Sequence, residues 1–263
     1  EVFPEISPAH LWFLYYLFLV TTLFIALRWV LRRRPLASVA YALRRIATLG
    51  VGALAHPLGP LLLAIPLMPL LATTPRGVLE SSDRGFVPDV TAVAIYGYMF
   101  CAGWALFRRP DVLIAFGRRW GWWLALSLAA GAAGFWLDVQ RASSGILVQP
   151  WPATLPNALT LAFATLGWIG FFIDRFNAPR PWVRYLADAS YWIYVIHLPI
   201  VVALQVWVSD WASLPLQLLV VNAVTFGVSL LTYDLLVRDT PLGSWLNGRR
   251  RPRWLRRRAP TPG

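Results

Sequence analysis

The sequence predicts an all-α protein that crosses a bilayer as a bundle of about seven helices. Hydrophobic residues make up 58% of the 263 residues and charged residues only 14%, whereas a soluble domain uses about 25% charged residues to cover its surface. Several apolar stretches reach the roughly 20 residues that a helix needs to cross the hydrocarbon. Fifteen Trp and nine Tyr are typical of the two lipid–water interfaces. These observations exclude a water-soluble globular fold.

Seven stretches qualify as spans, and they lie at roughly residues 10–31, 46–72, 91–107, 120–137, 154–173, 186–208 and 215–237. The second stretch contains Pro57, Pro60, Pro66 and Pro69. Each proline removes a backbone donor and clashes with the preceding turn, so we expect this span to be kinked or broken. The longest connection covers only about residues 74–90, so no soluble domain is expected.

The arginines predict the orientation of the bundle. All 24 basic residues are Arg, and alternating spans place six at the end of the first span and its loop, four in the third connection, three in the fifth and eight after the last span. Only Arg76, Arg84 and Arg141 remain for the opposite side. Because arginine concentrates in cytoplasmic segments, we expect the N-terminal end outside and the C-terminal end in the cytoplasm.

The net charge of +12 is therefore explained mainly by topology, and nucleic-acid binding is not expected. Residues 248–263 form a basic cytoplasmic tail, expected to be disordered, which can rest on anionic lipid headgroups. The single cysteine, Cys101, excludes an internal disulfide. The sequence also lacks a phosphate-binding glycine-rich loop, a cluster of metal ligands and a nucleophile elbow. We expect no metal and no bound cofactor.

Polar side chains at membrane depth are costly and usually face the bundle interior or a cavity. His197 lies near mid-bilayer in the sixth span, where Ser190, Tyr194 and His197 share one helix face. The alternative interpretation is a neutral histidine bonded to a neighbouring helix. His10 at the outer edge of the first span is either functional or simply interfacial, and His56 beside a proline favours a structural role.

The ends of the chain carry further patterns. Asp234 and Arg238 are one helical turn apart near the inner interface, which predicts an ion pair. Three segments also match motifs of a known family. They are His10-Leu11-Trp12-Phe13-Leu14-Tyr15-Tyr16-Leu17, then residues 185–199 with the sequence YLADASYWIYVIHLP, and finally Tyr233-Asp234-Leu235-Leu236-Val237-Arg238 followed by Gly243 and Leu246-Asn247-Gly248-Arg249.

The first segment resembles the HLWFL motif, and the second the SYxIYLxHxP helix, of the membrane acyltransferase 3 family. The third is similar to the C-terminal end of the branch that includes the glucan biosynthesis protein C group. That family has about ten transmembrane helices and begins in the cytoplasm. Residues 1–247 therefore resemble the C-terminal seven helices of such an enzyme, an expectation that agrees with an outside N-terminal end and with a chain that does not begin with Met.

The resemblance implies transfer of an acyl group from cytoplasmic acyl-CoA to an extracytoplasmic glycan or lipid, in a bacterial inner membrane. The glucan branch implies succinyl transfer to a periplasmic glucan. The family's catalytic His lies in its first helix, which the resemblance places upstream of residue 1, so the catalytic residue is not assigned here. Supporting roles are expected for His10, His197 and Tyr194.

Acyl transfer needs a base for the attacking hydroxyl and donors for the oxyanion. We expect substrate contacts from Trp12, Ser190 and Tyr191, and we expect arginines at 175, 180 and 184 to attract the phosphates of the donor. Two other interpretations stay open. One is a transporter or flippase for a glycan or lipid intermediate, because intramembrane histidines and broken helices also occur in such proteins. The other is an inactive truncated remnant.

Overall fold

The computed structural model describes residues 9–56, 58–74, 77–78, 87–144, 151–176, 178, 180–211 and 213–248. Within these ranges the chain is helical and contains no strand. The chain divides into two compact units, Glu1–Ala178 and Pro179–Gly263. The predicted tail beyond residue 248, as well as Pro57, Arg76 and Arg84, lie outside the described residues.

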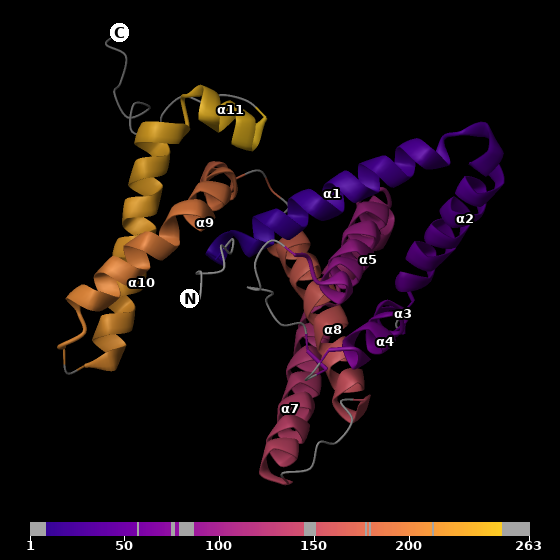
Figure 1. Cartoon of the computed structure of the whole chain (residues 1–263), viewed down its shortest axis with the longest axis horizontal. Coiled ribbons are helices and arrows are strands. Elements are labelled where there is room, and N and C mark those ends of the chain that lie inside the picture. Colours follow the sequence, from indigo (N-terminus) through magenta and orange to yellow (C-terminus); the bar gives the residue numbers. More distant parts are fainter. Residues whose placement is uncertain are drawn as a thin grey trace, which may run out of the picture. The chain divides into compact units, whose positions relative to one another are not determined.

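The first unit contains most of the helices (Figure 1). A short 3-10 turn, η1 (Ala9–Leu11), leads into α1 (Trp12–Leu31), and η2 (Arg34–Leu36) leads into α2 (Ala37–Leu54). There follow α3 (Gly59–Ala64), α4 (Leu67–Ala72), α5 (Val90–Phe107), α6 (Pro110–Gly117), α7 (Trp120–Ser144) and α8 (Trp151–Phe176). The second unit contains α9 (Pro181–Trp207), α10 (Leu214–Thr232), the π-helical turn η3 (Tyr233–Val237) and α11 (Pro241–Asn247).

Six helices of the described chain are long and apolar enough to cross a membrane. They are Trp12–Leu31, Val90–Phe107, Trp120–Arg141, Thr154–Phe176, Pro181–Trp207 and Leu214–Val237. Each one corresponds to a predicted span, which confirms an all-α polytopic membrane protein. The remaining predicted span, 46–72, is divided among the end of α2, α3 and α4.

Prolines and one tight turn account for these breaks. Pro60 occupies the first turn of α3 and Pro66 precedes α4, positions where a missing N–H costs little. Before α3, the backbone N–H of Leu58 donates to Nδ1 of His56 at 3.2 Å, which supports the structural role expected for this histidine. A Cβ at Gly59 would overlap the backbone of Leu54, so only glycine allows the turn from α2 into α3.

Helices α1 and α5 run parallel and side by side. Near their starts, the hydroxyl of Tyr16 accepts a hydrogen bond from the N–H of Asp89 at 2.9 Å. Near their ends, the Arg28 guanidinium lies 5.4 Å from the centroid of the Trp104 ring. The chain between these two helices must therefore return from the Arg28 end to the Asp89 end.

The return is made by α3 and α4. The hydroxyl of Tyr98, midway along α5, donates to the carbonyl of Leu63 at 3.1 Å. The hydroxyl oxygens of Thr73 and Thr91, near the end of α4 and the start of α5, lie 3.1 Å apart. Helix α2, which carries Arg44 at mid-length, stays at the Arg28 end. The second predicted span is thus shorter than expected, because its first part is a separate helix.

Helix α8 forms the centre of the first unit. Ala158, Ala162 and Leu166 are fully buried, in a cluster that includes Leu63 and Leu67 of the returning segment. Small residues on α8 let neighbouring backbones approach closely. On its other side α8 pairs with α7 as a long hairpin (Figure 1).

In the second unit, α9 and α10 form an antiparallel hairpin. The Tyr185 hydroxyl donates to the carbonyl of Leu230 at 3.2 Å, and the Trp192 indole donates to Thr232 at 3.0 Å. A Cβ at Gly243 of α11 would overlap the carbonyl oxygen of Val237. Because that glycine has no side chain, α11 packs directly on the π-helical turn.

Candidate functional site

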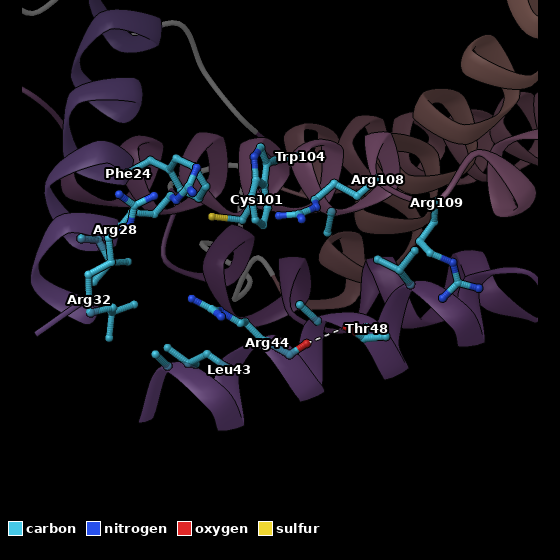
Figure 2. A pocket seen from close by; sticks show the side chains of 16 residues that line it. Phe24, Arg28, Arg32, Leu43, Arg44, Thr48, Cys101, Trp104, Arg108 and Arg109 are labelled. Atoms are coloured by element: carbon cyan, nitrogen blue, oxygen red, sulfur yellow. Dashed lines mark hydrogen bonds between the residues drawn. The ribbon is translucent and has the colours of Figure 1, made fainter. Parts of the chain in front are cut away.

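A pocket of about 710 Å³ opens among α1, α2 and α5. Each helix contributes one face with three- and four-residue spacing, and together they supply five arginines and mainly apolar side chains. The arginines are Arg28, Arg32, Arg44, Arg108 and Arg109. Figure 2 shows the side chains of Arg28, Arg44 and Arg108 gathered around Cys101, while Arg109 points away from them.

Aromatic rings hold two of these arginines. Trp104 has the Arg28 guanidinium 5.4 Å from its ring centroid and the Arg108 guanidinium at 4.9 Å, and Arg28 also lies 6.0 Å from Phe24. A guanidinium near an aromatic ring is stabilised by the electrons of the ring. The contact leaves the planar fork of N–H donors able to bind an anion.

The pocket keeps most of its positive charge. Arg109 donates two hydrogen bonds to the carboxylate of Asp111, at 2.9 and 2.7 Å, and these bonds lower the pKa of Asp111. Among the residues that the structure describes, no carboxylate lies within 4.0 Å of the other four guanidinium groups. Four cations beside an apolar wall form a site for an anionic, phosphate-bearing amphiphile.

Local interactions on α2 favour this arrangement. The hydroxyl of Thr48 donates to the backbone carbonyl of Arg44 at 2.9 Å. The polar group of Thr48 is therefore hydrogen-bonded within α2. Ala40 and Ala47 are the small residues of the same face. Their size leaves the space between α2 and the α1–α5 pair open.

The sequence motifs did not predict this pocket. Its arginines were interpreted only as markers of the inner side of the membrane, and substrate phosphates were assigned to arginines at 175, 180 and 184. A usable signal was present, because Phe24, Arg28 and Arg32 follow four-residue spacing and Trp104 precedes Arg108 by the same interval. Their approach in space depends on the parallel packing of α1 and α5.

The arginines expected to attract the donor have other contacts. Arg175 at the end of α8 pairs with Asp174 at 3.3 Å and lies 5.6 Å from the centroid of Trp120. Arg184 on α9 pairs with Asp188 at 3.4 Å. Arg180 directly precedes α9. Arg175 belongs to the first unit and the other two arginines to the second.

His197 lies half-buried within α9, and its Nδ1 is 2.7 Å from the carbonyl oxygen of Tyr194. The rings of these two residues are 5.7 Å apart. Because a carbonyl only accepts, Nδ1 is the donor in this contact. The exposed Ser190 donates to the carbonyl of Ala187 at 2.8 Å, and Tyr191 is also exposed.

His10 and Trp12 lie at the opposite end of α1 from the arginine pocket. His10 is in η1, and the Trp12 ring packs 6.2 Å from the ring of Tyr96 on α5. The ion pair predicted in the last span is confirmed, with Arg238 Nε 3.9 Å from Asp234 Oδ1. Both side chains are buried, and the Arg238 guanidinium lies 4.7 Å from the centroid of the Tyr185 ring.

The described residues contain no group of three side chains arranged to hold a metal ion. The described part of the chain is thus a set of membrane-spanning helices. It has a cationic pocket at the Arg28 end of α1, a histidine within a span and a buried ion pair. This is the architecture of a multi-pass membrane protein.

Comparison with known families identifies the kind of protein. Residues 2–234 match the acyltransferase 3 family model, described as an acyltransferase domain. The chain belongs to that family, which confirms the resemblance to the membrane acyltransferase 3 family, and it is a membrane acyltransferase. Searches of curated proteins and of solved structures gave no match.

Proposed function

We propose that this protein moves an acyl group from cytoplasmic acyl-CoA to a hydroxyl of an extracytoplasmic glycan, in a bacterial inner membrane. The observation that carries this proposal is the arginine pocket. It lies at the end of α1 and α5 that the arginine distribution assigns to the cytoplasm, which is where the donor is available.

The charge of the pocket fits the donor. Coenzyme A carries about four negative charges, from one phosphate monoester and one diphosphate. Four guanidinium groups of the pocket have no carboxylate partner among the described residues. Arginine binds phosphate through its planar fork of donors, and the apolar remainder of the lining suits the less polar arm of the molecule.

The reaction requires attack by the glycan hydroxyl on the thioester carbonyl. The new C–O bond forms as the C–S bond breaks, and the hydroxyl proton passes through a base to the departing thiolate. Neutral histidine is suited to this task near neutral pH. We propose a supporting role for His197, which lies within the α9 span with Nδ1 2.7 Å from the Tyr194 carbonyl, together with Tyr194.

The catalytic base itself stays a prediction, because the family resemblance assigns it to the first helix of the family and gives that role to no residue of this chain. His10 and Trp12 at the outer end of α1 are proposed to contact the glycan. The resemblance to the glucan branch favours a periplasmic glucan as acceptor and succinyl as the acyl group. No bound cofactor is required, since acyl-CoA is a co-substrate.

The test is acyl transfer by the purified natural full-length protein in liposomes. Radiolabelled acyl-CoA is added on the side of the C-terminal end and glucan on the other, and labelled ester on the glucan is the expected result. Glucan labelling that is equal to that of empty liposomes would overturn the proposal.

The break between α3 and α4 within the return crossing favours a second candidate, a glycan or lipid transporter, because transporters commonly use discontinuous helices. The same liposomes separate the two functions. Movement of unmodified glycan across the bilayer, with no acyl ester formed, would favour the transporter.

A further inference from the structure

A second hollow continues the arginine pocket between α1 and α5. It has a volume of about 150 Å³ and is lined by Val20, Leu23, Phe24, Leu27, Val93, Gly97 and Cys101. Phe24, Leu27 and Cys101 also line the arginine pocket, so the two hollows share a wall. We call the second one the α1–α5 groove.

The groove leads away from the charged end. Cys101 and Val93 are eight residues apart on α5, which corresponds to about 12 Å along the helix. Its lining contains no charged side chain. A ligand that spans both hollows therefore has an anionic end among the arginines and an uncharged apolar arm that extends toward the Asp89 end of α5.

We propose that the α1–α5 groove receives the acyl chain of the donor and that Gly97 limits the length of that chain. This inference rests on the proposed function and adds the substrate class, an uncharged acyl group. The succinyl group that the glucan branch implies fits poorly, because its free carboxylate would be desolvated in an apolar groove without a partner. The groove therefore argues against that part of the resemblance, while the proposed transfer from acyl-CoA is kept.

Charge favours acyl-CoA over a bilayer phospholipid as the occupant. A phospholipid headgroup offers one or two phosphodiester charges, which leaves at least half of the four guanidinium groups unmatched. The phosphates of coenzyme A carry about four charges, and four guanidinium groups line the same pocket without a described carboxylate partner. The pantetheine arm then lies along the apolar remainder of the arginine pocket, and the shared lining directs the acyl chain into the groove.

Gly97 is suited to the role of a length limit. A Cβ added at this position meets no atom within 4 Å, so a larger side chain enters the empty groove rather than the protein. Gly103 on the same helix gives a matched control, because its added Cβ also meets no atom within 4 Å and it lines neither hollow. Both substitutions remove one helical glycine from α5.

The experiment measures protection of Cys101, which lies at the junction of the two hollows and is the only cysteine of the printed sequence. Purified protein is treated with N-ethylmaleimide, and modification of the Cys101 peptide is followed by mass spectrometry. Protection curves are recorded with coenzyme A, succinyl-CoA and octanoyl-CoA for the parent protein and for Gly97→Leu and Gly103→Leu.

We expect octanoyl-CoA to protect the parent at lower concentration than coenzyme A or succinyl-CoA. Gly97→Leu should raise the octanoyl-CoA concentration that gives half-maximal protection of Cys101 about tenfold or more. The coenzyme A concentration that gives half-maximal protection should change by less than about twofold. Gly103→Leu should change neither. A different result is that coenzyme A protects Cys101, but Gly97→Leu weakens protection by octanoyl-CoA no more than protection by coenzyme A. The groove inference then fails, while the proposed donor site is retained.

Two other outcomes overturn the inference. Equal effects of Gly97→Leu and Gly103→Leu would mean that the helix, not the groove, is disturbed. Loss of co-purified anionic phospholipid in Gly97→Leu, with octanoyl-CoA protection unchanged, would assign the groove to bilayer lipid. Absence of protection by every CoA compound in the parent would overturn both the groove inference and the proposed donor site.

Discussion

Replacing Arg44 by glutamine removes one positive charge from the arginine pocket while it keeps a long polar side chain on α2. Arg44 lines the pocket and its guanidinium has no described carboxylate partner. Arg45 is the next residue of the same helix and is exposed, but it does not line the pocket. The two substitutions remove the same charge from the same helix, so they change the arginine distribution that sets the orientation equally.

The size of the effect follows from Coulomb's law. Two unit charges about 4 Å apart interact with about 1 kcal/mol in bulk water and about 4 kcal/mol at an effective dielectric constant of 20. Arg44 is exposed, so a loss near the lower end, about 1–2 kcal/mol, is expected. That loss corresponds to a roughly 5- to 30-fold increase in the Kd for coenzyme A.

The assay is titration of the purified protein with coenzyme A at two ionic strengths. Raising the salt from about 0.1 M to 1 M shortens the screening length from about 10 Å to about 3 Å. At the higher salt concentration the parent should therefore lose more affinity for coenzyme A than Arg44→Gln does. Arg45→Gln should show the same salt dependence as the parent. Equal weakening by the two variants, or an unchanged Kd in Arg44→Gln, would refute the assignment of this pocket to the donor phosphates.

Three further predictions concern other parts of the chain. His197→Ala in the full-length protein should lower acyl transfer at least tenfold at normal expression, whereas His56→Asn should not; unaltered acylation would exclude a catalytic part for His197. Gly243→Val should destabilise the protein by about 1–3 kcal/mol through overlap with the π-helical turn, measured by thermal unfolding, while Gly227→Val, which has open space, should unfold near the parent; equal midpoints would contradict this packing. Asp89→Ala should cost about 1 kcal/mol, because the Asp89 carboxylate accepts two N–H bonds at the start of α5, and Asp89→Asn should restore most of that stability; identical thermal midpoints would show that the cap is unimportant.

The spans were predictable because the bilayer imposes a length and a composition on each helix separately. Six predicted stretches therefore appear as continuous helices. The second predicted span is broken, as expected, and its first part belongs to a separate helix, α2. Apolar residues such as Val51 and Leu54 belong to α2, and they are buried in the same cluster as residues of α3, α5 and α8.

The candidate site was less accessible to sequence reasoning. His197 and Tyr194 were found because polar residues at membrane depth are rare, and the contact between them lies within one helix. Arg28, Arg44 and Arg108 come from three helices, and each one has an adequate explanation in the positive-inside rule. Only packing between helices distinguishes a residue that lines a pocket from its neighbour that does not.

The sequence by itself determined that the chain is an all-α membrane protein, that its arginines concentrate at alternate connections, and that its motifs belong to an acyltransferase family. Those properties depend on hydrophobic length, on charge and on local pattern, which are written along the chain. The tertiary structure alone decided that α1 and α5 are parallel, that α3 and α4 make the return crossing, and that α2 closes an arginine pocket against them. These arrangements depend on contacts between residues far apart in sequence, where side-chain shape and helix packing choose among many pairings.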